Sequence, residues 1–415
     1  MTQVVYESWV EIPAETARAL DVKQGDVLKV GSAHGSIEAP AYVSETLSAG
    51  AVAIPTGLGH TEYGRFARGV GQSPYALLPA EPAAGSGGPR WLGVRVTLQK
   101  TGKREKLASP AGVTEIDHSR EIFETVALAE AVKLEREGKA PEHANLPSMY
   151  PDLKYPQNRW GMAIDLDACT GCQACVVACQ AENNVPSVGK GDIDYGRSIQ
   201  WLRVERWWDR GGHEEKTAGS HAALPGVIGV AHAAEAPAGA PPSARFLPML
   251  CQHCEIAPCE PVCPVFAAYH TSDGLNAQIY NRCVGTRYCG NNCPYMVRRF
   301  NWYRYEWPAP MNLQLNPDVA VRDRGIMEKC TMCVHRIIAG RDRARDEGRL
   351  PRDGEILTAC QQTCPTQAIT FGDLKDGQSR VSRYSTSARG YHVLGELGTR
   401  PAVTYLKKIL REEHA

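Results

Sequence analysis

Fifteen cysteines are the residues of this 415-residue chain with the clearest capacity for chemistry, and none lies before Cys169. An odd number cannot all pair within one chain, and a chain of this length does not need disulfides to make up for a small core. The spacing instead indicates metal or cluster binding. The four groups are Cys169-x2-Cys172-x2-Cys175-x3-Cys179, Cys251-x2-Cys254-x4-Cys259-x3-Cys263-Pro264, Cys283-x5-Cys289-x3-Cys293-Pro294, and Cys330-x2-Cys333 followed by Cys360-x3-Cys364-Pro365.

The spacing within these groups is typical of iron–sulfur clusters. A loop with two residues between cysteines can curl around a compact cluster, whereas the three-residue step enters a helix and turns the last thiolate away. That last cysteine then serves a second cluster, as in bacterial two-cluster ferredoxins. A lone Cys-x2-Cys is often a zinc site, but four groups, three of them closed by Cys-Pro, favour clusters. Clusters that only stabilise the fold are the alternative to a redox role.

The third group lacks one ligand when it is compared with the first. Cys169-Thr-Gly-Cys172-Gln-Ala-Cys175 aligns with Cys283-Val-Gly-Thr286-Arg-Tyr-Cys289, which places Thr286 at the position of Cys172. The second and fourth groups also match, as Cys-x2-Cys…Cys-x3-Cys-Pro with a longer middle gap in the fourth. Sixteen ligand positions with one lost leave the 15 cysteines that the chain contains. The sequence therefore predicts a duplicated two-cluster ferredoxin with a gap at Thr286.

The gap at Thr286 leaves two cluster types open. Threonine is not a usual iron ligand, so a site with three thiolates most simply holds [3Fe–4S]. The rival is a [4Fe–4S] cluster with an open iron, as in a dehydratase, and binding of a small hydroxy acid would support it. No substrate-binding constellation surrounds Thr286 in the sequence, so the three-iron cluster is favoured.

Both helices and strands are predicted around these loops, which gives an α+β fold class. Residues 1–107 are predicted to be β-rich, with strands at 8–12, 27–30, 37–43, 51–54 and 94–98 and a helix at 13–22. Residues 108–158 are a predicted linker with a helix from Ser119 to Gly138. Residues 159–375 carry the cysteines and a loop insertion at 211–245, and residues 376–415 form a C-terminal extension with helix-compatible stretches.

Charge and hydropathy exclude some functions. Lys plus Arg and Asp plus Glu both number 46, so bulk charge does not favour nucleic acid as a partner. No run of apolar residues approaches the length of a membrane span, and the first ten residues do not resemble a secretory signal. Arg298, Arg299 and Arg304 alternate with aromatic residues, which indicates a cation–aromatic layer or a docking surface beside a cluster rather than a nucleic-acid site.

Residues 160–405 resemble the four-cluster iron–sulfur subunits of the molybdopterin oxidoreductase superfamily, the electron-transfer partners of formate, polysulfide and nitrate enzymes. Residues 5–105 resemble the C-terminal domain of the catalytic subunits of that superfamily, a six-stranded double-psi β-barrel that closes over the pterin. The runs that carry the two resemblances are Arg282-Cys-Val-Gly-Thr-Arg-Tyr-Cys289-Gly-Asn-Asn-Cys293-Pro-Tyr295 and Glu328-Lys-Cys330-Thr-Met-Cys333 for the first, and Trp9-Val-Glu-Ile12, Gly35-Ser-Ile-Glu-Ala-Pro40 and Gly57–His60 for the second.

The two pieces in this order resemble the fused iron–sulfur subunit of alternative complex III, a bacterial quinol oxidase. The chain differs by lacking most of the molybdopterin-like half, so a split-gene subunit or an incomplete product is expected. The resemblance implies three [4Fe–4S] clusters and one [3Fe–4S] cluster, and a pterin is not expected on this chain alone. The implied ligand sets are Cys169, Cys172, Cys175 and Cys364; Cys330, Cys333, Cys360 and Cys179; Cys251, Cys254, Cys259 and Cys293; and Cys283, Cys289 and Cys263 for [3Fe–4S].

The resemblance further implies an electron-transfer subunit without catalysis of its own. The expected partners are an integral membrane quinol-binding subunit, a molybdopterin-like large subunit and multihaem cytochrome c subunits. The expected place is the periplasmic face of a membrane, as a peripheral subunit. The alternatives are the iron–sulfur subunit of a molybdenum enzyme such as polysulfide or tetrathionate reductase, an open-iron enzyme at Thr286, and an assembly or scaffold role for the N-terminal domain.

Overall fold

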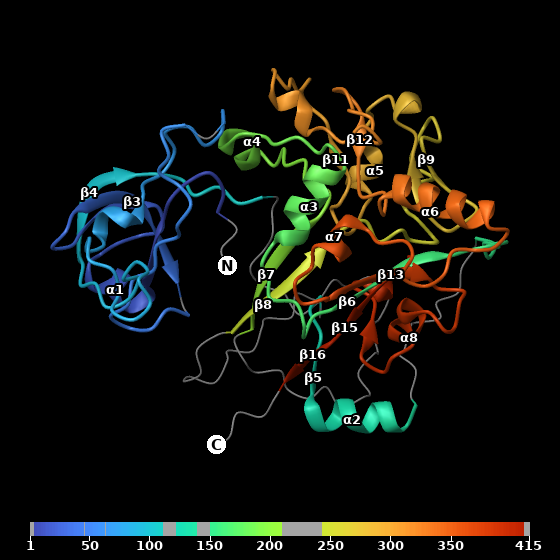
Figure 1. The fold of residues 1–415 in the computed structure, drawn as a ribbon, viewed down its shortest axis with the longest axis horizontal. Helices are drawn as coiled ribbons and strands as arrows, with labels where there is room; N and C mark the ends of the chain where they lie inside the picture. The colour runs from blue at the N-terminus through green and yellow to red at the C-terminus, as the bar shows by residue number, and fades with distance from the viewer. Residues whose placement is uncertain are drawn as a thin grey trace, which may run out of the picture.

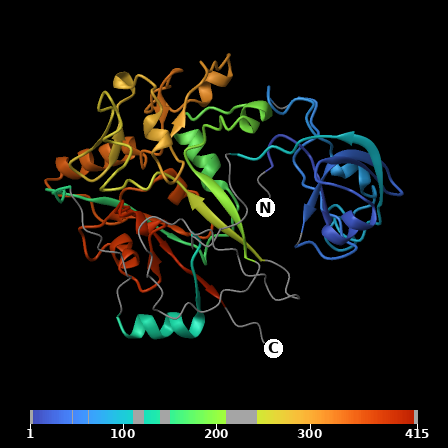
Figure 2. The same cartoon turned by 180° about the vertical axis from the view of Figure 1, so that it is seen from behind.

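The computed structural model describes residues 4–44, 46–62, 64–110, 122–138, 150–209 and 243–410. Figures 1 and 2 show two lobes, a smaller one built by the N-terminal residues and a larger one that contains all the cysteines. Each lobe has its own hydrophobic core. The predicted loop insertion lies mostly outside the described residues, and its last residues begin strand β8 (Ser243–Met249).

The N-terminal lobe contains one four-stranded sheet with the order β1-β3-β2-β4. Strand β1 runs parallel to β3, and β2 runs antiparallel to both β3 and β4. The side chains of Ile12, Leu28 and Val30 are fully buried in its core. The elements are β1 (Val10–Pro13), α1 (Ala14–Ala19), β2 (Asp26–Gly31), β3 (Ser36–Ser44), a 3-10 turn at Pro74–Leu77 and β4 (Thr97–Arg104).

Most predicted elements of this lobe are confirmed. The strands expected at 8–12, 27–30 and 37–43 correspond to β1, β2 and β3, and the helix at 13–22 corresponds to the shorter α1. The strand expected at 51–54 is wrong, because only Ala53 forms an isolated bridge, with Glu11. The last predicted strand starts later, at Thr97. The described residues form four strands, and the six-stranded double-psi barrel stays a prediction.

The larger lobe is centred on a second four-stranded sheet with the order β13-β6-β15-β14. Strand β6 (Trp160–Asp165) precedes the first cysteine group, and β13 (Ile369–Asp373) follows the last. Strand β15 (Val403–Leu406) runs parallel to β6, and all four of its residues are buried. The helices suggested for the C-terminal extension are therefore wrong at this point, since a strand covered on both faces reads as a continuous apolar run.

Short ladders and helices complete this lobe. Strand β5 (Thr125–Ala127) of the linker pairs with β16 (Lys408–Leu410) of the C-terminal extension. Helix α2 (Leu128–Arg136) ends before Gly138, as predicted. Its predicted start is wrong, because residues 125–127 form strand β5 and the helix begins only at Leu128; Ser119 lies outside the described residues. The other elements are α3 (Ala174–Glu182), α4 (Lys190–Asp194), β7 (Arg203–Asp209), β9 (Ala268–His270), β10 (Asn276–Gln278), α5 (Tyr288–Asn291), β11 (Arg299–Phe300), β12 (Met327–Glu328), α6 (Val334–Asp346), α7 (Ala359–Gln362), α8 (Arg380–Ser385) and β14 (Gly390–Tyr391).

Candidate iron–sulfur sites

Antiparallel strand pairs bring cysteines from distant groups together. The strand that leads into Cys169 is β6, and it pairs with β13, which follows Cys364. In the same way β10 leads into Cys283 and pairs with β9, which follows Cys263, so that Gln278 lies opposite Ala268. Each pair therefore places the last cysteine of one motif beside the first cysteine of another.

Two cavities in the larger lobe are each lined by four cysteines. The first contains three cysteines of the first group and one of the fourth, and the second contains three of the second group and one of the third. The donor set and the concave shape fit a thiolate-bound cluster in both places. The residues are Cys169, Cys172, Cys175 and Cys364 in the first cavity, and Cys251, Cys254, Cys259 and Cys293 in the second.

A third set of thiols meets where α3 packs against α7. Cys179 is buried, and burial raises the pKa of its thiol well above the usual value. Cys330, Cys333 and Cys360 raise that pKa further, and Cys175 of the first set adds a smaller effect, so Cys179 has these thiols as neighbours. Glu182 links α3 to α6 beside this set, because its carboxylate accepts a hydrogen bond from Arg336 (Nη2, 2.7 Å) and lies 2.7 Å from His335 Nε2.

The remaining cysteines are Cys263, Cys283 and Cys289. The β9–β10 hairpin places Cys263 and Cys283 at one end, and Cys289 lies in the first turn of α5. The buried Arg298 connects this set to the one at Cys251, since its Nη1 donates to Cys259 Sγ at 3.3 Å and its guanidinium also hydrogen-bonds Cys289. Thr286 is exposed beside this set.

The loop around Thr286 has the same backbone signature as the loop around Cys172. Gly171 and Gln173 flank Cys172 with φ of 69° and 63°, and Gly285 and Arg287 flank Thr286 with φ of 73° and 65°. The Cys-x2-Cys loops of the second and fourth groups share another signature, a positive φ at His253 and Met332. Left-handed residues tighten a loop so that its amides point inward. The matched pairs of loops are consistent with the predicted internal correspondence.

Backbone amides donate to several of the sulfurs. Ala267 N lies 3.1 Å from Cys263 Sγ, and Ala368 N lies 3.3 Å from Cys364 Sγ. Both bonds close the same turn, in which the third residue after the cysteine has a positive φ. Hydrogen bonds to cluster sulfurs stabilise negative charge and tune the reduction potential. Three further backbone amides lie 3.4 Å from a cysteine Sγ: Met327 N from Cys283, Met332 N from Cys330, and Ala359 N from Cys333.

Burial makes the free thiols poor acids. It raises the pKa of Cys175, Cys259 and Cys360 to about 12. Cys263 differs, because backbone hydrogen bonds outweigh its burial and lower its pKa. A buried thiol releases its proton readily only when a bound metal supplies compensating charge. Among the described residues no three His, Cys, Asp or Glu side chains converge on one metal ion.

The four sets form a line of neighbours, in the sense that each set acts on the next through charge or a hydrogen bond. Burial is the largest cause of the raised pKa of Cys175, and Cys360, which belongs to the set at Cys179, raises it further. Burial is likewise the largest cause of the raised pKa of Cys330, and Cys251, which belongs to the next set, raises it further. Arg298 then joins Cys259 to Cys289. The order along this line begins at the set with Cys169, passes through the sets with Cys330 and Cys251, and ends at the set with Cys283.

Gly285 allows a selective test of the loop at Thr286. A Cβ at this residue would collide with the carbonyl oxygen of Gly325 and lie 2.9 Å from the Phe300 ring. We expect Gly285→Ala to destabilise the loop by on the order of 2 kcal/mol and to remove about three irons per chain. The matched control is Gly348→Ala, which shares the positive φ but has nothing within 4 Å. Equal iron loss in both variants would contradict this prediction.

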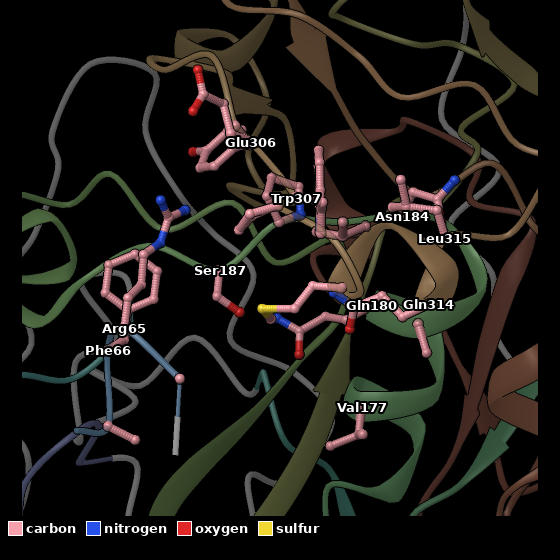
Figure 3. Close-up of a pocket in the computed structure, with 18 of the residues that line it drawn as sticks. Arg65, Phe66, Val177, Gln180, Asn184, Ser187, Glu306, Trp307, Gln314 and Leu315 are labelled. Atoms are coloured by element: carbon pink, nitrogen blue, oxygen red, sulfur yellow. The ribbon is translucent and has the colours of Figure 1, made fainter. Parts of the chain in front are cut away.

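The structure also places two sizeable cavities outside the cysteine sets. One, of about 630 Å³, lies between the lobes and is lined by Arg65 and Phe66, by α3 and by the 305–315 segment. Figure 3 shows Arg65 and Phe66 facing Trp307 and Gln180 across it. Ion pairs flank this junction, with Lys190 Nζ 2.8 Å from Glu7 and Lys106 Nζ 2.7 Å from Asp194.

The other cavity, of about 830 Å³, is lined by Thr286 together with arginine and aromatic side chains. Sequence reasoning placed Arg298 and Arg299 near a cluster but missed Arg197 and Arg287 as their neighbours. No local pattern could have found Arg197, because it reaches this cavity from the segment after α4. The fold therefore gathers charged and aromatic side chains around Thr286 that are not neighbours of it in the sequence.

Three family models match separate parts of the chain. Residues 2–89 match the "Molydopterin dinucleotide binding domain", residues 160–181 match a "4Fe-4S binding domain" and residues 243–309 match a "4Fe-4S dicluster domain". The matches place a domain of the molybdopterin type before iron–sulfur domains of the ferredoxin type. Among the described helices, none has the length and apolar character that crossing a membrane requires.

The chain is also similar to subunits of several oxidoreductases. It is 40% identical to the iron–sulfur cluster-binding subunit of menaquinone reductase of Nitratidesulfovibrio vulgaris, over 60% of this chain and 89% of that protein. It is 32% identical to iron–sulfur subunit 1 of an Hdr-like menaquinol oxidoreductase of Archaeoglobus fulgidus, over 62% and 86%. It is 31% identical to one of the subunits of tetrathionate reductase of Salmonella typhimurium, over 60% and 73%.

The cysteine sets and these similarities define an iron–sulfur protein of the electron-transfer class. The chain belongs to the family of the iron–sulfur subunits of molybdopterin oxidoreductases. Its relatives include subunits of quinol oxidoreductases and of reductases, among them a polypeptide of the polysulfide reductase of Wolinella succinogenes that is 29% identical.

Proposed function

We propose that this chain is the electron-transfer subunit of a quinol oxidoreductase of the alternative complex III type. The observation that carries the proposal is the line of four thiol sets, which runs from Cys169 to Cys283 through the larger lobe. Bound iron–sulfur clusters would supply one-electron transfer along it. The chain's own residues hold the thiolates, exclude water and donate hydrogen bonds to sulfur, and no bond-making chemistry is assigned to them.

The proposed ligand sets are the four described above. Cys169, Cys172, Cys175 and Cys364 would hold one [4Fe–4S], and the other two complete sets would hold one each. The shared cavities support the sets at Cys169 and Cys251, and the mutual effects on pKa support the set at Cys179. The hairpin pairing supports Cys263 as a partner of Cys283 and Cys289.

The set at Cys283 would hold [3Fe–4S], with Thr286 at the missing corner. The matching φ angles around Cys172 and Thr286 support the proposal that the two loops are copies of one ancestral loop. A duplicated pair of two-cluster ferredoxins accounts for this match and for the repeated Cys-Pro turn. At the ligand positions, the two loops then differ only in that Thr286 stands where the other loop has Cys172.

The proposed assembly places electron entry at the [3Fe–4S] end. An integral membrane quinol-binding subunit would meet that end, on the periplasmic face of the membrane, and multihaem cytochromes would accept electrons elsewhere. The N-terminal lobe, proposed to be of the double-psi type, would join a molybdopterin-like large subunit. We propose no pterin on this chain alone.

Low-temperature EPR with iron quantitation on the anaerobically purified chain tests this proposal. We expect about 15 irons per chain, a [3Fe–4S] signal in the oxidised state and three clusters that become visible on stepwise reduction. About 16 irons without that signal would contradict the three-iron site. Tightly bound zinc in place of iron would contradict the whole proposal.

Two other functions each have an observation in their favour. The similarity to a tetrathionate reductase polypeptide favours the iron–sulfur subunit of a molybdenum enzyme, and a co-purifying catalytic subunit that contains molybdenum would support it. The arginine-lined cavity at Thr286 favours an open-iron enzyme, and a hydroxy acid that alters the EPR spectrum would support that. Full subunit association after deletion of residues 1–107 would count against a scaffold role for the N-terminal lobe.

A further inference from the structure

The 830 Å³ cavity beside Thr286 is lined by several positively charged side chains. Four arginines line it, and no aspartate or glutamate does so among the residues that the structure describes. Positive charge in a concave site whose lining contains no acidic side chain favours an anion. The arginines come from three segments and are Arg197, Arg287, Arg298 and Arg299.

Two of these arginines already have partners in the protein. Arg298 donates to Cys259 and to Asn276 Oδ1 at 3.0 Å, so its charge is accounted for by the neighbouring thiol set. Arg197 donates to Tyr303 Oη at 2.6 Å and lies 3.4 Å from Asp192 Oδ1. Its guanidinium also stacks over Trp302, with 4.9 Å to the ring centroid.

The other two arginines have no hydrogen-bonded carboxylate within the described part of the chain. Arg299 is only 7% exposed, and its Nη2 has no hydrogen-bond partner there, although its Nε donates to Gln200 O at 3.4 Å. Arg287 stacks over Phe300 and Trp302, with 5.3 and 5.0 Å to the ring centroids. A buried donor without a partner is unfavourable, and an anion in the cavity would supply that partner.

The rim of the same cavity is apolar and exposed. Tyr288 is 61% exposed and Met296 is 56% exposed, and both line the cavity. Val284, next to Cys283, is 63% exposed. The matching loop at Cys172 has the small or polar residues Ala174 and Thr170 where this loop has Tyr288 and Val284. The apolar rim therefore occurs at the Thr286 loop and has no counterpart at the Cys172 loop.

We infer that the cavity binds the phosphate group of an anionic phospholipid. Arg197, Arg287 and Arg299 would donate to the phosphate from different sides, which suits a tetrahedral oxyanion better than a planar carboxylate. The lipid chains would lie against Tyr288 and Met296, so the lipid would lie at the junction with the membrane subunit that we propose at this end. Inorganic phosphate has the same head chemistry without the chains, so the test separates these two sources. The inference makes no use of the cluster type at Thr286.

The test measures binding of the purified cluster-containing chain to sedimented vesicles at fixed ionic strength. One set of vesicles is pure phosphatidylcholine, and the other contains phosphatidylglycerol in addition. We expect binding only to the second set. Arg287→Gln should weaken it about fivefold, and Arg197→Gln with Arg287→Gln together about 25-fold. Arg287→Lys, which retains the charge, should restore most of the binding, and unchanged EPR signals and iron content show that each variant is folded.

The matched control is Arg383→Gln, which removes an exposed arginine of α8 far along the sequence from this cavity. It should leave vesicle binding unchanged. If inorganic phosphate binds with the same dependence on Arg287 and vesicles do not, the lipid inference is overturned and the site is a free-phosphate site. If neither binds, or if Arg383→Gln weakens vesicle binding as much as Arg287→Gln, the inference is wrong. The iron count that tests the proposed function is independent of all these outcomes.

Discussion

Thr286→Cys is expected to convert the three-iron site into a four-iron site. The backbone at Thr286 already has the flanking φ angles of the Cys172 loop, so a thiol placed there would point to the missing corner. Iron content should rise from about 15 to about 16 per chain, and the oxidised-state [3Fe–4S] signal should disappear. EPR and iron quantitation on the same anaerobic sample check both.

The functional effect of Thr286→Cys should also be large. A change of cluster type changes the net charge, which is one determinant of the reduction potential. A fall of about 59 mV in the reduction potential of the cluster lowers the equilibrium constant for its one-electron reduction about tenfold. Reduction of the assembled complex by quinol should therefore slow by at least about tenfold, measured by anaerobic rapid mixing.

Thr286→Ser is the matched control for this substitution. It retains a hydroxyl of nearly the same size and offers no thiolate, so it should retain the three-iron signal and the rate. An unchanged iron content in Thr286→Cys, or a gain of iron in Thr286→Ser, would show that Thr286 is not the vacant ligand position.

Removal of iron is expected to unfold the larger lobe and to leave the N-terminal lobe folded. Eight cysteines belong to the hydrophobic core of the larger lobe, whereas the core of the N-terminal lobe contains none among the described residues. Helices α5 and α7, which carry ligand cysteines, have only four residues each and cannot be stable alone. Metal binding contributes on the order of 10 kcal/mol to folding in small metal-dependent domains.

Limited proteolysis after anaerobic chelation measures this effect. We expect a resistant fragment within residues 4–110 and rapid digestion of residues 150–410, identified by mass spectrometry. The untreated protein is the control and should resist digestion in both lobes. A larger lobe that remains resistant after complete loss of iron would show that the clusters are not part of its folding.

The local geometry of the cysteine loops could be predicted from the sequence. Two residues between cysteines force a tight loop, and the structure has left-handed residues at Gln173, His253, Arg287 and Met332 within such loops. The comparison of Cys172 with Thr286 likewise needed only the sequence, because it compares short segments. Strands β1 to β3 were predictable because alternation of apolar residues is a local signal.

The C-terminal extension could not be predicted in the same way. Strand β15 is buried on both faces beside β6, so its residues show no alternation. A run of four residues with a single polar member, Thr404, is compatible with either a helix or a strand. Its pairing with β6 on one side and β14 on the other decides that it is a strand.

The sequence by itself determined how many thiols there are, and it predicted how each loop is shaped and where a ligand is missing, because these depend on residues a few positions apart. Only the tertiary structure decided which thiols share a cavity, in what order the sets follow, and that Arg197 meets Arg287 and Arg299 beside Thr286. The physical reason is that these contacts join residues far apart in the chain. Strand pairing and burial bring them together, and neither leaves a local pattern around the residues concerned.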